Sequence, residues 1–115
     1  MTGQSGIVSV YATFGSEEEA RRIGRTAVEE SLAACVNILG PCHSIYRWQG
    51  RIEEAGEIAA LFKTASSRAE ALIARIAELH SYDAPAAVAW PVIHAPDLYR
   101  AWLLDETSGS EPWKV

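Results

Sequence analysis

The sequence has few of the residues that staple a chain together covalently. Its 115 residues include two cysteines, Cys35 and Cys42, whereas a disulfide-rich secreted scaffold needs more. No apolar run is long enough to span a bilayer, and the N-terminal segment lacks the basic start and apolar centre of a signal peptide. We therefore expect a cytoplasmic protein with no membrane partner and with reduced thiols.

Basic residues are also in the minority. The chain has 10 Lys and Arg residues against 15 Asp and Glu residues, which gives a formal net charge of -5 at pH 7. An acidic surface repels a phosphate backbone. We therefore expect no nucleic-acid partner.

Spaced metal-ligand motifs are absent as well. The sequence contains neither an H-x-x-x-H nor a C-x-x-C spacing, and such spacings are typical of a site preformed within one subunit. A site shared between subunits stays open. The first loop, residues 13–16, has neither the cysteine pair of a soft-metal chaperone nor the arginine of an acyl-phosphate hydrolase.

The composition that remains is that of a globular domain. Apolar residues make up 49% of the chain and charged residues 22%, so residues 1–115 are predicted to form one domain with a real core. Residues 7–13 alternate apolar with small or polar side chains, which predicts a strand. Ser16 and Glu19 form a capping-box pattern, which predicts a helix from there to about Ala33.

The longest predicted feature is a hairpin over residues 35–64 that turns at Gln49-Gly50. Its first arm would be about 45 Å long if straight, whereas a domain of this length should be roughly 35 Å across. The arm must therefore bend at Gly40-Pro41 or project beyond its own domain. Since the far end carries Tyr46 and Trp48, we expect an obligate oligomer in which a partner covers these rings.

The second half of the chain predicts a helix and then a strand. Ser67 and Glu70 form another capping-box pattern, which marks the start of the helix. Residues 86–93 read as a strand, and Pro91 favours a place at the edge of a sheet.

A last helix is predicted to begin at Pro96. Its expected apolar side comprises Leu98, Trp102 and Leu103, and Trp113 predicts that the C-terminal tail docks on the domain. The element order is therefore β-α-β-β-α-β with an extra helix, an α+β, ferredoxin-like arrangement with an antiparallel sheet. Two helices would cover one face of the sheet and leave the other open to a neighbour.

The thiols and the histidines are the candidate metal ligands. Cys35 is expected to fill a small apolar position in its strand, since free cysteine is usually buried. Cys42 and His43 point to opposite strand faces, which is poor geometry for joint chelation. His80 ends the second helix, where it either satisfies the last carbonyl groups or binds a metal.

Three more residues have two open interpretations each. Glu57 and Lys63 share one face of their predicted strand and are either partners of a ligand or ordinary polar strand positions. Tyr82 either lines a site or packs a loop onto the edge of the sheet.

Several blocks of the sequence together resemble the CutA family of divalent-cation tolerance proteins. The first blocks are ACVNI at residues 34–38, SIYRWQG at residues 44–50, Glu57, and Lys63-Thr64. Later blocks are HSYDAPA at residues 80–86, Pro91-Val92, and YRAW at residues 99–102. The resemblance covers about residues 7–104, and the combination of blocks carries it.

This resemblance implies a non-enzymatic homotrimer whose assembly is similar to that of PII signalling proteins. Tyr46 and Trp48 would then contact neighbouring subunits. The resemblance links the protein to copper tolerance and implies no obligatory cofactor. If the trimer binds Cu(II) or another divalent metal ion, His80 and Cys35 are the expected ligands, near subunit contacts.

An alternative function is that of a PII-like sensor. It would bind a small anion or metabolite in the cleft between subunits, with Trp48, Glu57, Lys63 and Tyr82 as the lining residues.

The chain departs from the family pattern at a few positions. The departures are Ser81 for a proline, Ala86 for a glutamate, Leu79 for a histidine of some members, Ala12 for a cysteine of some members, and Gly40-Pro41 in reversed order.

Overall fold

The computed structural model describes residues 5–109 and forms a ferredoxin-like α+β fold. The elements are β1 (Ile7–Phe14), α1 (Glu17–Glu29), β2 (Cys35–Trp48), β3 (Arg51–Ala65), a 3-10 turn (Ser66–Arg68), α2 (Ala69–Leu79), β4 (Ala87–Val92) and α3 (Asp97–Glu106). This order confirms the predicted fold class. Trp113 and its predicted docking lie outside the described residues.

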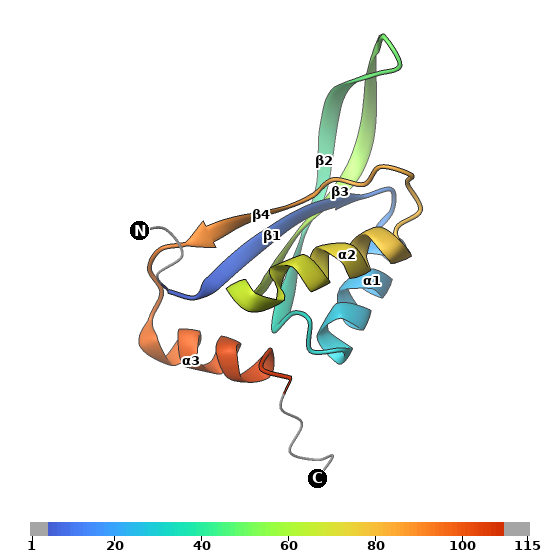
Figure 1. Ribbon diagram of the computed structural model, residues 1–115. Helices are drawn as coiled ribbons and strands as arrows, with labels where there is room; N and C mark the ends of the chain where they lie inside the picture. The colour runs from blue at the N-terminus through green and yellow to red at the C-terminus, as the bar shows by residue number, and fades with distance from the viewer. Residues whose placement is uncertain (1–4, 110–115) are drawn as a thin grey trace.

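The four strands form one antiparallel sheet in the order β2-β3-β1-β4. Helices α1 and α2 lie together against one face of it (Figure 1). The prediction for Pro91 is confirmed, because β4 is an edge strand. Proline has no backbone N–H, and an edge strand tolerates this loss better than a central strand does.

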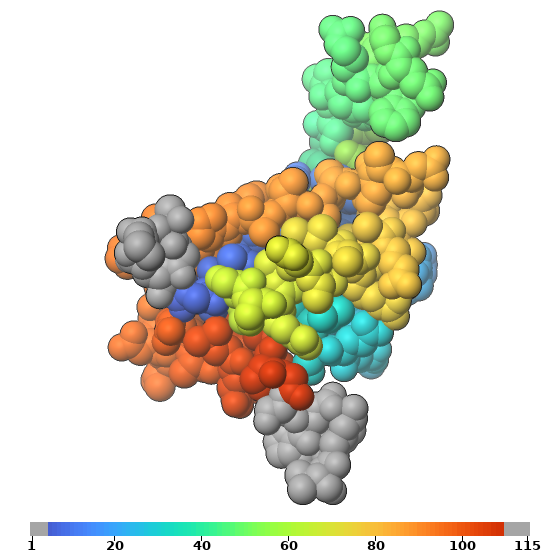
Figure 2. Space-filling view, in the orientation of Figure 1, coloured from blue at the N-terminus to red at the C-terminus, as the bar shows by residue number. Residues whose placement is uncertain are grey.

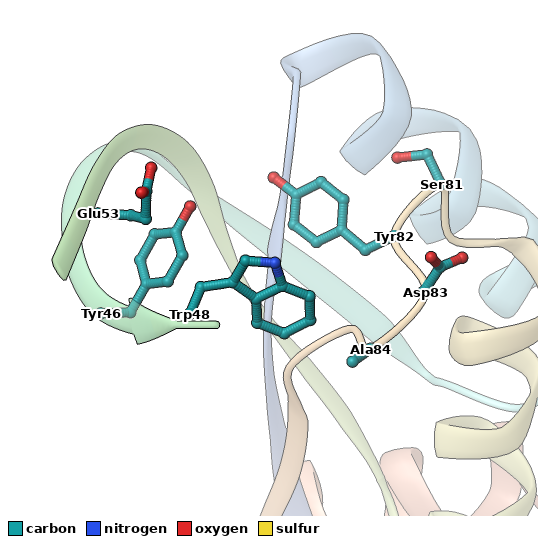
Figure 3. Close-up of a pocket in the computed structure, with 7 residues that line it drawn as sticks. All are labelled: Tyr46, Trp48, Glu53, Ser81, Tyr82, Asp83 and Ala84. Atoms are coloured by element: carbon teal, nitrogen blue, oxygen red, sulfur yellow. The ribbon is translucent and has the colours of Figure 1, made fainter. Parts of the chain in front are cut away.

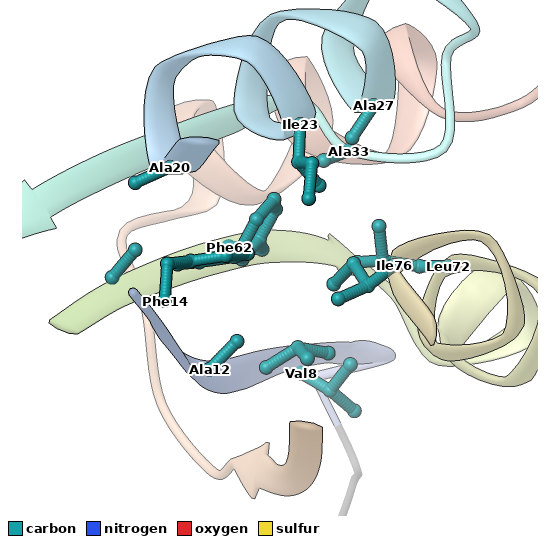
Figure 4. Packing of buried hydrophobic residues seen from close by; sticks show 12 residues of the cluster. Val8, Ala12, Phe14, Ala20, Ile23, Ala27, Ala33, Phe62, Leu72 and Ile76 are labelled. Carbon is teal, nitrogen blue, oxygen red and sulfur yellow. The ribbon is translucent and has the colours of Figure 1, made fainter. Parts of the chain in front are cut away.

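The core lies between these two helices and the sheet (Figure 4). Alternate residues of β1 and β3 point into it, so that Val10 lies beside Phe62 and Ala12 beside Ala60. Ile23 of α1 and Ile76 of α2 close the cluster, in which all of these side chains are fully buried. Period-two alternation in the strands and a 3.6-residue stripe in the helices therefore meet in one core.

Two predicted helix boundaries are wrong. Helix α1 ends at Glu29 rather than near Ala33, because Ser31 takes a left-handed φ of 60° and turns the chain back toward the core. Helix α2 begins at Ala69, without a side-chain cap. Ser67 lies instead in the preceding 3-10 turn, so its predicted capping box does not form. The Ser16 cap is present, since its Oγ accepts a hydrogen bond from the Glu19 N–H at 3.1 Å.

The β2–β3 hairpin both bends and projects. A β-bulge lies between Ile38 and Gly40, and Gly40 has a φ of 105° that suits glycine. The far end of the hairpin then extends beyond the rest of the domain (Figures 1 and 2). Gln49 and Gly50 both have positive φ, as a two-residue hairpin turn requires. The radius of gyration is accordingly 15.0 Å, against the roughly 13 Å of a compact domain of this length.

The sheet face opposite α1 and α2 carries exposed apolar side chains. Val88 and Trp90 of β4 are both exposed on this face, and Trp90 stacks on Tyr11 with ring centroids 5.9 Å apart. This observation confirms that one subunit leaves a sheet face open.

Helix α3 covers only one end of this open face. Leu103 is 1% exposed and packs against Ile7 and Ala34. Leu98 is 87% exposed and Trp102 is 43% exposed, so the predicted apolar side of this helix is wrong for those two residues. Helix α3 meets the domain with the face that contains Leu103, and Leu104 packs partly buried against the same cluster. No helix within residues 5–109 is long and apolar enough to cross a membrane.

Candidate functional site

A hollow lies between the projecting hairpin and the loop that joins α2 to β4. Tyr46 and Trp48 of β2 and Glu53 of β3 line one side, and residues 81–84 line the other (Figure 3). Its volume is about 490 Å³. The hairpin register explains the first side, because Tyr46 and Trp48 alternate onto one strand face and Glu53 stands directly across from Tyr46.

Tyr82 joins the loop to the sheet. Its hydroxyl donates a hydrogen bond to Oε2 of Glu57 at 3.0 Å. Burial of the phenol, together with the Glu57 carboxylate, raises the pKa of Tyr82 to about 12. Tyr82 therefore remains a hydrogen-bond donor at neutral pH, and two of the residues predicted to bind a ligand are in contact.

His80 is held inside the fold. Its Nε2 lies 2.7 Å from the Thr13 carbonyl oxygen, and its Nδ1 accepts a hydrogen bond from the Tyr82 N–H at 3.1 Å. The ring also stacks on Phe14, with centroids 5.0 Å apart. Because a carbonyl oxygen only accepts, this pattern suits the tautomer that carries its proton on Nε2. Both ring nitrogens are therefore occupied within the chain.

Glu19 fixes the start of the same loop. Its Oε1 accepts from the Gly15 N–H at 3.2 Å, and its Oε2 accepts from the Ser81 N–H at 2.7 Å. Burial by itself would raise the pKa of this carboxyl, but the hydrogen bonds from Ser81 and Gly15 outweigh it and hold the pKa below its ordinary value. Ser81 stands where the family pattern has proline, and a proline has no N–H to donate.

Cys35 and Lys63 lie at the other end of the sheet. They are cross-strand partners in β2 and β3. Sγ of Cys35 is 3.9 Å from the Tyr99 hydroxyl, and Nζ of Lys63 donates to Oδ1 of Asn37 at 2.5 Å. The structure therefore divides the predicted cleft residues, with Trp48, Glu57 and Tyr82 near the hairpin and Lys63 near α3.

Cys35 and His80 are not brought together within one chain. His80 contacts Thr13, whereas Lys63, the cross-strand partner of Cys35, lies opposite Ser9. Thr13 lies four positions after Ser9 in the extended strand β1, which corresponds to a distance of roughly 13 Å. Among residues 5–109, no group of three or more His, Cys, Asp or Glu side chains is placed to hold a metal ion.

The remaining candidates have ordinary partners. Cys42 and His43 lie on opposite strand faces, as predicted, and Nε2 of His43 is 2.7 Å from Oε1 of Glu54. Sequence reasoning missed Glu53 and Asp83 as residues of the hollow. Glu53 could have been found by counting back across the two-residue turn, whereas no pattern in the sequence points to Asp83.

The fold is that of a ferredoxin-like protein whose sheet leaves one face open and whose β2–β3 hairpin projects beyond the domain. The sequence pattern of the CutA1 divalent ion tolerance proteins matches residues 8–106. The chain belongs to this family. The divalent-cation tolerance protein CutA of Thermus thermophilus is 44% identical over 98 residues, covering 85% of this chain and 95% of that protein. Its counterpart in Pyrococcus horikoshii is 40% identical over 101 residues, which cover 88% of this chain and 98% of that protein.

Solved structures of the family have the same fold. The structure of CutA from Xylella fastidiosa aligns with a TM-score of 0.86 and 37% identity, covering 89% of this chain and 98% of that one. Some eukaryotic relatives are longer. Human protein CutA is 36% identical over 88% of this chain, which spans 56% of the human protein.

Proposed function

We propose that this protein acts in divalent-cation tolerance as a non-enzymatic homotrimer. Its family is named for tolerance of divalent ions, not for a reaction. The observation that carries the assembly is the open sheet face, on which Val88 and Trp90 are exposed, together with the projecting hairpin. Apolar surface of this kind marks an interaction site, and further copies of the same chain are the proposed cover.

The proposed cargo is Cu(II) or another divalent cation, bound between subunits. Cys35 and His80 do not converge within one chain, so a site that used either would need a donor from a neighbour. Cys35 is the better placed of the two, since it is only partly buried and its sulfur has one weak contact, with Tyr99. His80 would have to break two hydrogen bonds before it could bind a metal.

Calorimetric titration of the purified assembly with Cu(II) tests this proposal. A parallel titration with Zn(II), which has no redox chemistry, avoids oxidation of the thiol. Cys35→Ser is expected to weaken metal binding at least about tenfold, since it removes a soft ligand. Cys42→Ser is the matched control and should bind as the wild type does. Equal affinity of the Cys35→Ser variant and the wild type would remove Cys35 from the site.

A second candidate function, a PII-like sensor, is favoured by one observation, the hollow at Tyr46, Trp48 and Tyr82. A thermal-shift screen against metabolites and divalent cations separates the two functions. Stabilisation by a metabolite but not by Cu(II) supports the sensor, and the reverse supports the tolerance protein. We propose a cytoplasmic location for this chain. Its relatives include a chloroplastic protein of Arabidopsis thaliana and a protein of Archaeoglobus fulgidus described as periplasmic.

A further inference from the structure

We propose that the hollow between the hairpin and residues 81–84 binds a small organic cation of the alkylammonium class. The inference does not depend on metal binding at Cys35. It deepens the second candidate function by naming the ligand, and it replaces the anion expected from the sequence with a cation.

The lining has the chemistry of a cation site. Three aromatic rings border the hollow, those of Tyr46, Trp48 and Tyr82, and its lining carboxylates are Glu53 and Asp83. Tyr46 and Trp48 extend from the hairpin and the Tyr82 ring extends from the loop toward them (Figure 3), and Asp83 follows Tyr82 in the same loop. The face of an aromatic ring attracts an ammonium group, most strongly in the case of tryptophan. Carboxylates at the rim add attraction for the same charge.

The same lining disfavours the other ligand classes. No Lys, Arg or His side chain lines this hollow, so an anion would meet two carboxylates without a compensating positive charge. Glu57 adds a third acid behind Tyr82. Arg51 stands across the hairpin from Trp48 but does not line the hollow. The hollow also lacks a metal-binding site, because no three or more His, Cys, Asp or Glu side chains within residues 5–109 are placed to hold a metal ion.

The loop side of the hollow is already in place without a ligand. The hydroxyl of Tyr82 is held by Glu57, its N–H by His80, and its ring lies 4.6 Å from the His80 ring between centroids. Ser81 is tied to Glu19 of α1. A wall that is fixed beforehand costs less conformational entropy on binding. The volume of about 490 Å³ lies in the ordinary range for small-molecule sites.

Choline and 3,3-dimethyl-1-butanol provide the test, because they share a shape and differ in charge. Calorimetry on the full chain in its native assembly should give an affinity for choline at least about tenfold higher than for the neutral alcohol. The Glu53→Gln, Asp83→Asn double variant should weaken choline binding about fivefold and leave the alcohol unchanged. Trp48→Leu keeps an apolar side chain, loses the ring face, and should weaken choline binding about tenfold.

Glu54→Gln is the matched control, because Glu54 neighbours Glu53 but lies on the other strand face with His43. It should bind choline as the wild type does. Equal affinity for the alcohol and choline, stronger binding of inorganic phosphate, or no choline binding by the wild type would each overturn the proposal. Cys35→Ser separates the two sites, since it should weaken metal binding and leave choline binding unchanged. A chain that binds choline but no metal would overturn the metal proposal alone.

Discussion

A single buried carboxylate, Glu19, connects three parts of the molecule. It lies in the first turn of α1, receives the N–H of Gly15 before that helix, and receives the N–H of Ser81 after α2. His80 lies close by, with Nδ1 3.7 Å from Oε2 of Glu19. The loop that carries Tyr82 to the hollow is thus positioned by one ionised group with its hydrogen bonds.

Glu19→Gln is predicted to destabilise the protein by about 2 kcal/mol at neutral pH, because a buried, charged acceptor of two backbone N–H groups is lost. The sign of the pH dependence follows from the lowered pKa of Glu19 in the folded state. Its contribution is complete above the unfolded pKa of about 4.3 and is lost as the pH falls through the lower folded value. Urea unfolding at a series of pH values measures both effects.

The Glu19→Gln variant should therefore lose less stability than the wild type as the pH falls below about 4. Glu18→Gln is the control, since Glu18 lies in the same helical turn but its side chain is 79% exposed. Identical acid slopes for the wild type and Glu19→Gln would contradict the role given to this carboxylate.

Among the elements, the contact between α1 and β2 depends on a glycine. A Cβ at Gly24 would lie 2.9 Å from Cγ1 of Val36, which is closer than carbon atoms pack. Gly24 is itself buried in the middle of α1. Glycine has a lower helix propensity than alanine, but at this position it allows the helix to approach the strand closely.

Gly24→Ala is predicted to destabilise the protein by about 1 kcal/mol. The clash with the stiff, β-branched Val36 costs about 1–3 kcal/mol, which outweighs a propensity gain of about 1 kcal/mol. In a Val36→Ala background the same change should become stabilising, since only the propensity gain remains. Chemical denaturation of the four proteins of this double-mutant cycle measures the coupling. Additive effects would show that the close contact carries no strain.

On the scale of the whole molecule, a single subunit leaves apolar side chains uncovered. The longest dimension is 49 Å and the shortest 21 Å, and the far end of the hairpin projects beyond the rest of the domain (Figure 2). Ile45, Trp48 and Ile52 are exposed there. The proposed homotrimer would bury such surface against other copies and so add stability.

Trp48→Asp is predicted to dissociate the proposed homotrimer, because it places a charge where an apolar contact with a neighbouring subunit is expected. Light scattering coupled to size exclusion should report a mass near that of one 12.5 kDa chain. Trp48→Phe keeps an apolar ring and should keep the mass of the wild type. A Trp48→Asp variant that still elutes as a trimer would place the subunit contact elsewhere.

Local patterns in the sequence were sufficient to predict most of the fold. The alternation in residues 7–13, the Gln49-Gly50 turn and Pro91 each act through their immediate neighbours, so the strands, the hairpin and the edge position were all predictable. The misplaced boundaries have a different origin. Ser67 has the residue type of a cap, but the chain around it forms a 3-10 turn, and a cap requires a particular backbone conformation as well as a hydroxyl.

The sequence by itself determined the element order, the core alternation and the length of the hairpin, because these depend on short-range periodicity and turn chemistry. Only the tertiary structure decided which side chains share a site. It joined Tyr82 to Glu57 across 25 positions of sequence. It also engaged both nitrogens of His80. Contacts of this kind depend on how loops and strands pack in space. No local pattern of residues encodes the distance between side chains that lie far apart in the sequence.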